Sequence, residues 1–391
     1  MIFVGIDVAK NKHDCFIMDS DGVILKDVFT FKNSLEGFSK LKEILLSLIP
    51  QSDLKDIRIA LEATGHYSDA LSKFLKDNNF NLTIFNPLST KFFRTSQTLR
   101  KTKTDKVDAV CITQMLMFNA PSSFVDETET MKEIKELSRH RFRLIGYRSK
   151  LKVSFTRIID IIFPELPSNI CSIHQNSSYS LLLELPSTSD ISKCHLTKLQ
   201  NLLSKSSKGK YGKAKALELR EVAKHSIGVN SYARSLELQQ TIRLIQDLER
   251  EIKLLDIKIK EVLDTLKTPL MTIPGISYTL AAIILSEIKD INNYSTPAKL
   301  LAFSGLEPST HQSGNYTSTH SRMVKRGSKY LRWALLTASR TVAMRAPVFE
   351  EYLLKKRSEG KHYLVALTHV ARKLIRVIFH LLKTDEEFVK K

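Results

Sequence analysis

The sequence has 391 residues, of which 42% are hydrophobic and 26% are charged; this is ordinary for a globular chain of two or three domains and excludes a fibrous or disordered protein. The formal net charge of +19 favours a polyanionic partner, most commonly nucleic acid, and the excess is concentrated between Asn315 and Lys391. Charged residues interrupt the first apolar run, and no stretch is apolar enough to span a bilayer. We therefore expect a cytoplasmic protein with reduced cysteines and neither a signal peptide nor a membrane span.

The N-terminal part of the chain has the pattern of a mixed α/β sheet. An apolar run opens it, and two further runs alternate apolar and polar residues around Asp21-Gly22, a typical hairpin turn. Three early strands followed by alternating helices and strands predict a fold of the ribonuclease-H type over residues 1–120. We expect strands at 2–8, 13–19, 23–31, 57–61 and 81–85, and helices at 34–48 and 67–76.

The rest of the chain is predicted to be helical, so the fold class is α/β plus all-α. A basic loop at 91–103 precedes a helix at 105–118, and residues 127–162 form one long basic helix. The Ser- and Lys-rich segment 164–230 is predicted to be an inserted helical subdomain with a flexible middle. It belongs to a central helical region at 121–267, and a helical C-terminal domain follows at 268–391.

A second long helix is predicted by a heptad-like seam between Leu238 and Leu266. Its apolar residues recur in alternating steps of three and four, the pattern of a coiled coil. This seam could pair with the helix at 127–162 of the same chain, or with a second subunit. The seam consists of Leu238, Thr241, Ile245, Leu248, Ile252, Leu255, Ile259, Val262 and Leu266.

Four carboxylates occupy positions where they could share a metal site. Asp7 lies near the end of the first strand, Glu62 follows the apolar run of the fourth, and Asp105 and Asp108 lie one turn apart on a helix. Carboxylate oxygens are the ligands that Mg²⁺ prefers, and two such ions can serve phosphodiester cleavage.

The same spacing has simpler explanations. Acids at the first turn of a helix are stabilised by the helix dipole, and acids at strand ends are common. Asp14, Asp19 and Asp21 are alternative ligands nearby, but their positions are typical of exposed edge or turn residues.

Several longer motifs add a family resemblance. The blocks VGIDVAK, LEATGHY and NPLSTKFFRTSQTLRKTKTDKVDA, followed far along the chain by IPGIS and GLEPSTHQSG, together resemble the DEDD-type insertion-sequence transposases. The N-terminal domain of that family is similar to the Holliday-junction resolvase RuvC. The resemblance covers both ends of the chain and its long helix, and leaves segment 164–230 unmatched.

The resemblance implies a DNA transposase or recombinase with specific site residues. It assigns the metal-binding and catalytic tetrad to Asp7, Glu62, Asp105 and Asp108, with two Mg²⁺ ions for which Mn²⁺ could substitute. It also implies a nucleophilic serine, Ser313 in HQSG, which would form a covalent phosphoserine. Family members are understood to act on donor and target DNA as dimers that assemble into tetramers, guided by a structured RNA. Without the resemblance, Ser313 is simply a turn residue, and Ser309, Ser318 and Ser321 are rival candidates.

Nucleic-acid contacts are predicted at three basic segments and at one glycine-containing turn. Cations mixed with Phe92 and Phe93 precede the acidic helix, although these rings could instead be core residues. The long basic helix could follow a nucleic-acid backbone, the IPGIS turn could approach a phosphate or be an ordinary turn, and a basic glycine-containing loop precedes the helix around Leu331. The predicted contacts are Lys91, Arg94, Arg100, Lys101, Lys103, Arg141, Arg148, Gly275, Lys325, Arg326 and Lys329.

Three other functions fit parts of the same pattern. A site-specific DNA invertase of the same family would use all the site residues. A resolvase-like nuclease would use the acids but not Ser313, and a non-catalytic nucleic-acid-binding protein would need neither.

Overall fold

The computed structural model describes residues 1–48, 54–63, 65–97, 104–118, 128–309, 312–313, 316–317 and 322–389. The chain divides into two compact units, Met1–Asp126 and Glu127–Lys391. None of the helices in these described ranges combines the length and apolar character needed to cross a membrane.

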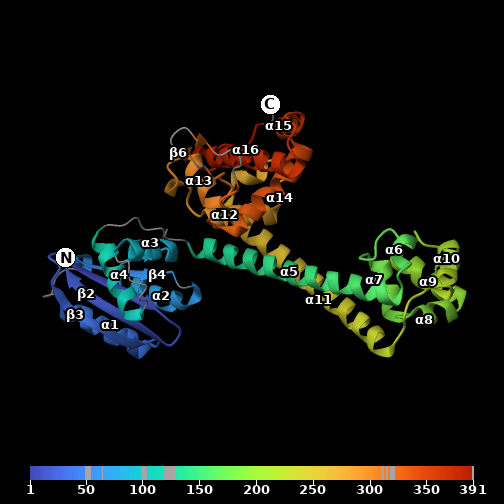
Figure 1. The fold of residues 1–391 in the computed structure, drawn as a ribbon, viewed down its shortest axis with the longest axis horizontal. Coiled ribbons are helices and arrows are strands. Elements are labelled where there is room, and N and C mark those ends of the chain that lie inside the picture. Colours follow the sequence, from blue (N-terminus) through green and yellow to red (C-terminus); the bar gives the residue numbers. More distant parts are fainter. Residues whose placement is uncertain are drawn as a thin grey trace. The chain divides into compact units, whose positions relative to one another are not determined.

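The first unit contains the predicted mixed sheet. Its five strands lie in the order β3-β2-β1-β4-β5, with β1 at the centre (Figure 1). The first three strands are antiparallel, whereas β4 runs parallel to β1 and β5 runs parallel to β4. The strands are β1 (Ile2–Val8), β2 (Lys12–Asp19), β3 (Ile24–Lys32), β4 (Ile57–Glu62) and β5 (Asn81–Phe85).

Residue parity decides which helices cover each face of this sheet. The even residues of β1, such as Val4 and Ile6, are fully buried in the core formed with α1 (Leu35–Ser47) and α2 (Asp69–Asp77). The odd residues, such as Phe3, face α4 (Asp105–Met117) on the opposite side. The two faces therefore have separate hydrophobic cores.

The predicted basic loop at 91–103 is wrong over its first part, because residues Pro87–Gln97 form helix α3. Pro87 occupies the first helical position, where its missing N–H costs nothing, and the Asn86 side chain accepts the Leu88 N–H at 2.9 Å. The remainder, with Arg100, Lys101 and Lys103, lies outside the described residues.

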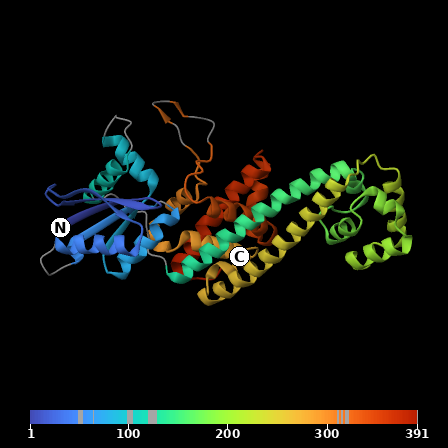
Figure 2. The ribbon, with the colours of Figure 1, turned by 90° about the horizontal axis from the view of Figure 1, so that it is seen from below.

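The second unit is organised by two long helices that lie side by side, α5 (Glu129–Ile162) and α11 (Tyr232–Leu266) (Figure 2). They are antiparallel, since the start of α5 and the end of α11 share one hydrophobic core, whereas their other ends share a second. The seam of α11 therefore pairs within the chain, the first of the two predicted possibilities. Leu238, Ile245 and Ile259 of the seam are fully buried.

Short helices complete each of these two cores. Segment 164–230 packs at the end of α5 as α6 (Leu166–Asn169), α7 (Asn176–Glu184), α8 (Thr188–Lys193), α9 (Leu196–Ser207) and α10 (Lys213–Lys224). The C-terminal core contains α12 (Tyr278–Ile288), α13 (Pro297–Ser304), α14 (Lys329–Arg345), α15 (Pro347–Ser358) and α16 (Tyr363–Thr384), and the single-turn helices η3 (Pro269–Thr272) and η4 (Ile291–Asn293).

The expectation of an all-helical C-terminal part is wrong in one place. Strands β6 (Gln312–Ser313) and β7 (Tyr316–Thr317) pair as a short antiparallel hairpin between α13 and α14. Pro308, which cannot supply the N–H of a helix interior, forms an isolated bridge with Met323 at the base of this segment. The described residues Gln312–Ser313 and Tyr316–Thr317 are therefore paired strands rather than helix.

Candidate functional site

The strand geometry brings Asp7 and Glu62 to the same edge of the sheet. Ile6 of β1 pairs with Leu61 of the parallel strand β4, so the next residue of each strand is an acid. The carboxyl ends of parallel strands meet at one sheet edge. Asp7 is an odd residue of β1 and therefore lies on the face that α4 covers.

Helix α4 carries the other two predicted acids to this face. Its N-terminus is fixed by Thr104, whose hydroxyl accepts the Val107 N–H at 3.3 Å. The helix approaches β1 so closely that a Cβ atom at Gly5 would lie 2.5 Å from the Ala109 carbonyl oxygen. A glycine two residues before Asp7 thus permits the contact that brings the buried Asp108 to the sheet.

The pKa of Asp7 depends on both its burial and the acids around it. Burial is the largest cause that raises the pKa of Asp7 to about 7, and the negative charges of Asp108, Asp105 and Glu62 raise it further, in that order. The structure therefore brings together the four acids that the sequence analysis selected.

Asp14 is a further acid of this site, and the expectation that it is an exposed edge residue is wrong. It lies opposite Asp7 in the register of β1 and β2, is only 4% exposed and adds to the negative charge that raises the pKa of Asp7. The Thr30 hydroxyl donates a hydrogen bond to it. Side chains two residues apart in a strand lie on the same face of the sheet, so Asp14 shares its face with the buried Phe16. This alternation could have placed Asp14 on the α4 face from the sequence.

The other alternative acids are turn residues, as expected. Asp19 accepts the backbone N–H groups of Asp21 and Val23 at 2.9 and 2.8 Å, and Asp21 is exposed. Both therefore stabilise the turn around Gly22, whose φ of +85° favours glycine.

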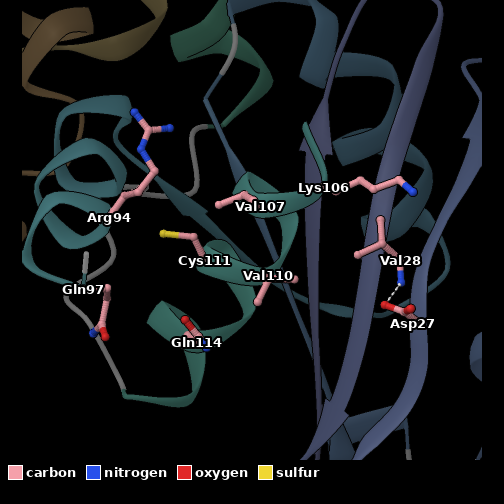
Figure 3. Close-up of a pocket in the computed structure, with 9 residues that line it drawn as sticks. All are labelled: Asp27, Val28, Arg94, Gln97, Lys106, Val107, Val110, Cys111 and Gln114. Carbon is pink, nitrogen blue, oxygen red and sulfur yellow. Dashed lines mark hydrogen bonds between the residues drawn. The ribbon is translucent and has the colours of Figure 1, made fainter. Parts of the chain in front are cut away.

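Arg94 supplies a positive charge beside the acids. Its guanidinium group donates to the Asp108 carboxylate at 2.5 Å. Arg94 and Cys111 also line a cavity between α3, α4 and β3 (Figure 3). One predicted nucleic-acid contact is therefore joined to the acidic site by an ion pair.

The donor chemistry of the acidic site fits Mg²⁺, because every predicted ligand is a carboxylate. Burial, followed by the charges of the neighbouring carboxylates, raises the pKa of Asp7. As the side chains stand, no group of three His, Cys, Asp or Glu residues within the described ranges is arranged to hold a metal ion. The acids are near one another, while Asp108 is directed to Arg94.

Ser313 lies on the hairpin of the second unit, where it pairs with Tyr316. Backbone hydrogen bonds hold the base of this segment: Ser309 N–H donates to the Arg322 carbonyl at 2.7 Å, and Val324 N–H donates to Glu307 at 2.9 Å. Of its rivals, Ser309 uses its hydroxyl to accept the Arg322 N–H at 3.0 Å. Ser318 and Ser321 lie outside the described residues.

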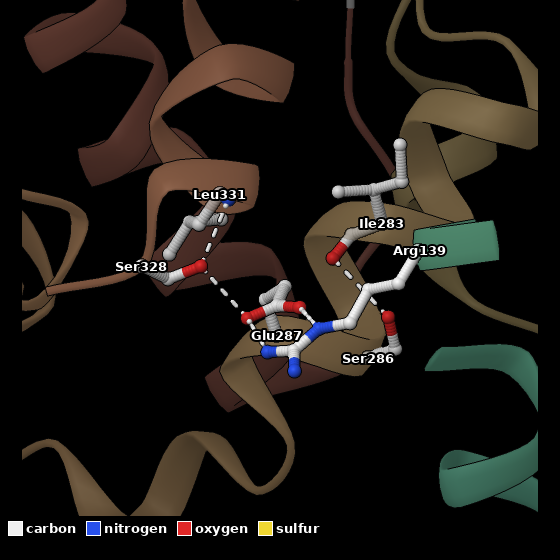
Figure 4. Close-up of polar contacts among 6 residues, drawn as sticks. All are labelled: Arg139, Ile283, Ser286, Glu287, Ser328 and Leu331. Atoms are coloured by element: carbon white, nitrogen blue, oxygen red, sulfur yellow. Dashed lines mark hydrogen bonds and ion pairs between the residues drawn. The ribbon is translucent and has the colours of Figure 1, made fainter. Parts of the chain in front are cut away.

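A buried carboxylate fixes the basic loop that follows this segment. Glu287 of α12 accepts both a hydrogen bond from the Ser328 hydroxyl at 2.7 Å and a bidentate ion pair from Arg139 at 2.7 and 3.0 Å (Figure 4). Ser328 in turn caps α14 by accepting the Leu331 N–H at 3.1 Å. The loop that carries Lys325 and Arg326 is therefore anchored at its end next to α14.

Of the predicted contacts in this loop, Lys325, Arg326 and Lys329 are all exposed. Gly327 has a φ of +90° and lies so close to Phe303 that a Cβ atom would be 1.9 Å from the Phe303 carbonyl oxygen. The backbone of the loop is thus packed against α13 while its cations face solvent, an arrangement that suits phosphate binding.

Other predicted contacts also make interactions within the protein. Arg141 forms an ion pair with Asp256 of α11 at 2.5 Å, and Arg148 lies 3.7 Å from Glu249 of the same helix. Gly275 has a φ of +100° and packs against the backbone of Thr341 in α14. These residues have structural roles in joining helices, and Lys91 on α3 is exposed.

Comparison with known proteins gives matches at both ends of the chain. Residues 4–164 match a family described as a transposase, and residues 267–354 match the transposase IS116/IS110/IS902 family. The first match contains all four acids of the predicted tetrad, and the second contains Ser313.

Similar proteins extend over nearly the whole chain. The 44.8 kDa protein of insertion element IS116 from Streptomyces clavuligerus is 24% identical over 402 residues, which cover 99% of this chain and 96% of that protein. The pilin gene-inverting protein of Moraxella bovis is 25% identical over 395 residues, which cover 100% and 98% of the two chains.

Proposed function

Because the chain belongs to the IS116/IS110/IS902 transposase family and is accordingly a DNA transposase or recombinase, we propose that it cleaves and rejoins DNA with a metal-binding acidic site and a nucleophilic serine. The observation that carries this proposal is the group of carboxylates around Asp7. Burial and then the negative charges of these carboxylates raise the pKa of Asp7 to about 7, and a bound cation would offset that negative charge.

Asp7, Glu62, Asp105 and Asp108 would hold the metal, with Asp14 next to Asp7 as a further acceptor. Mg²⁺ bound there, as two ions or with Mn²⁺ in its place, would stabilise the attacking and leaving oxygens of a phosphodiester. The five-stranded mixed sheet with β1 at its centre supports the RuvC-like assignment. Arg94 balances the charge of Asp108 when no cation is bound.

Ser313 would act as the nucleophile. Its hydroxyl oxygen would form an ester bond to the scissile phosphorus as the bond to one deoxyribose oxygen breaks; the serine proton is lost and the leaving oxygen gains one. The phosphoserine replaces the broken phosphoester bond with a new one of the same kind. The hydroxyl group of a second DNA end can therefore attack this phosphorus and release the serine. The match of residues 267–354, which contain Ser313, to the transposase family supports this role.

The partners proposed for this chain are donor and target DNA, a structured guide RNA, and further copies of itself as a dimer or tetramer. The net charge of +19 and the exposed cations Lys325, Arg326 and Lys329 support nucleic-acid binding. The acids and Ser313 belong to different compact units, which makes assembly of the complex a possible point of control.

Variants of the two halves of the site provide the test. Asp7→Asn and Ser313→Ala should each abolish recombination between DNA substrates that carry the element ends, while DNA binding is retained. A protein–DNA adduct mapped to Ser313 by mass spectrometry would establish the covalent step. Full recombination by Ser313→Ala would contradict the serine mechanism and leave a metal-dependent nuclease.

A mixture of the Asp7→Asn and Ser313→Ala proteins tests whether two subunits contribute to one catalytic site. If Asp7 and Ser313 of different subunits act together, the mixed proteins should recover part of the recombination activity that each has lost. Absence of recovery, together with a normal assembly state, would mean that one chain supplies both halves.

DNA inversion is a second candidate function, favoured by the similarity to the pilin gene-inverting protein of Moraxella bovis over the whole chain. Inversion and transposition use the same cleavage and rejoining steps and differ in the arrangement of the two DNA sites. Substrates with inverted sites on one molecule, compared with sites on two molecules, would separate the two functions.

A further inference from the structure

A cavity of about 330 Å³ lies beside the acidic site in the first unit. Side chains from three elements line it: Val28 of β3, Gln97 of α3, and Val107, Val110 and Gln114 of α4 (Figure 3). Its volume is at the lower end of the range for small-molecule sites. None of the residues predicted for the acidic tetrad lines it.

The floor of this cavity is apolar although it faces solvent. Ala109 and Ile112 of α4 are fully buried against the sheet, but Val107 on the other side of the helix is 38% exposed. Val110 and Val28 are partly exposed as well. A helix that is apolar on the face not covered by its own sheet indicates a partner for that face.

The rim of the cavity is polar and mainly cationic. Arg94 and Lys106 supply two positive charges, and Gln97 and Gln114 supply amide donors and acceptors. Asp27 is the one acid among the lining residues that the structure describes, and one of its oxygens accepts the Val28 N–H at 2.7 Å. An apolar floor with cations at the rim complements a flat aromatic group attached to phosphates.

Arg94 connects the cavity to the acidic site. It lines the cavity and also donates to Asp108, one of the four acids proposed to hold the metal. A phosphate bound at the cavity rim would therefore lie within reach of the same guanidinium group that Asp108 now uses. The occupant is thus expected to belong to the DNA on which the acidic site acts.

We propose that this cavity binds one unstacked base of the DNA substrate, with Arg94 and Lys106 contacting the phosphates that flank it. The inference rests on the proposed function, because the acidic site defines where the DNA backbone passes. The valines contact the base face, while Gln97 and Gln114 are placed to meet polar groups at its edge. Arg94 exchanges Asp108 for a DNA phosphate, which releases the carboxylate for its proposed metal.

The cysteine that lines the cavity is compatible with a base-binding surface, because its thiol is neutral. Cys111 is 5% exposed, and burial, followed by the negative charge of Asp108, raises the pKa of its thiol to about 11. The thiol therefore stays protonated at neutral pH and adds no charge to the base-binding surface.

Photo-crosslinking of the full-length protein tests this proposal without requiring catalysis. The probe is a mixed-sequence single-stranded DNA that contains iododeoxyuridine, irradiated with the protein in the absence of divalent metal. We expect crosslinks in the peptide that contains α4, at the residues that line the cavity. Crosslinks confined to the second unit, or stronger labelling by the RNA of the same sequence, would overturn the assignment to a DNA base.

A filled cavity provides a second test. Val107→Phe places a ring in the cavity, and we expect it to reduce both the α4 crosslink and the affinity for the probe by about tenfold, the loss of roughly one base contact. The matched control is Leu35→Phe, on the 73% exposed residue at the start of α1, which covers the opposite face of the sheet. Equal crosslinking by both variants would refute the proposal.

An acidic-site variant separates this inference from the proposed function. Asp7→Asn should keep the α4 crosslink while it loses recombination. If the wild-type protein crosslinks through α4 but never cleaves DNA, the base site stands and the proposed reaction fails. If it cleaves DNA but gives no α4 crosslink, the reaction stands and the base site fails.

Discussion

Asp7 of β1 and Asp14 of β2 are direct partners in the antiparallel register of their strands, so two carboxylates face each other on the sheet surface that α4 covers. After burial and the charges of Asp108, Asp105 and Glu62, the negative charge of Asp14 also raises the pKa of Asp7. The pair lies at the sheet edge where the proposed metal site is placed.

Neighbouring charges should control the pKa of Asp7 in a graded way. Asp108→Asn and Asp14→Asn each remove a negative charge, so both should lower the pKa of Asp7 from its value of about 7. The decrease should be larger for Asp108→Asn, because Asp108 contributes more. Carboxyl-carbon NMR titration of metal-free protein measures both, and an unchanged pKa in the two variants would show that the acids are not close together.

Asp7→Asn should stabilise the metal-free protein at neutral pH. The folded state raises the pKa of Asp7 from 3.8 to about 7, so the folded protein holds this proton more tightly than the unfolded chain. Its stability therefore falls as the pH rises from about 4 to 7 and then stays level. The amide removes this cost, a gain of about 1–2 kcal/mol after solvent screening.

Thermal unfolding at several pH values checks this prediction. The gain in melting temperature should be full above pH 7 and should vanish at pH values below the unfolded pKa. Mg²⁺ should stabilise the wild-type protein more than the variant. A variant that is less stable than wild type at neutral pH in the absence of metal would contradict the prediction.

Gly5→Ala should damage both stability and activity. The new methyl group would lie 2.3 Å from the Thr113 hydroxyl and 2.5 Å from the Ala109 carbonyl, so α4 must move away from β1. We expect a loss of about 1–3 kcal/mol, together with a loss of metal-dependent DNA cleavage as Asp108 moves from Asp7.

Gly146→Ala is the matched control for this change. Gly146 lies within helix α5, and a Cβ atom there would meet nothing within 4 Å. This variant should be more stable by up to about 1 kcal/mol because alanine favours the helix. Calorimetry and a cleavage assay on both proteins distinguish a specific clash at Gly5 from a general intolerance of alanine.

Glu287→Gln should loosen the anchor of the basic loop. Glu287 is 4% exposed and accepts from both Arg139 and Ser328. Loss of its charge weakens the bidentate pair with Arg139 and should cost about 1–3 kcal/mol. Ser328→Ala, which removes the α14 cap and one of the bonds to Glu287, should cost about 1 kcal/mol.

Tryptophan fluorescence can follow this unfolding step directly. Trp333 is the single tryptophan of the chain and lies 5.1 Å from the Phe142 ring, measured between ring centroids. It therefore reports on the packing of α14 against α5. Equal denaturation midpoints for Glu287→Gln and the wild-type protein would mean that the ion pair contributes nothing to the fold.

The sequence by itself determined the elements and the acids of this protein. Strand alternation and helical spacing predicted β1 to β5, α1, α4, α5 and α11, because these elements bury apolar faces with regular periods. Asp7, Glu62, Asp105 and Asp108 were selected from strand ends and helical spacing, and then from family motifs. Local patterns suffice where a residue's position along an element fixes the direction of its side chain.

Only the tertiary structure decided which of these groups act on one another. Asp14 seemed an exposed edge residue until strand register placed it opposite Asp7, and Arg94 seemed a loop cation until α3 carried it to Asp108. Arg141 and Arg148 seemed free for nucleic acid until α11 supplied Asp256 and Glu249. Each partner lies in another element, and the pairing of separate elements depends on packing that no local period encodes.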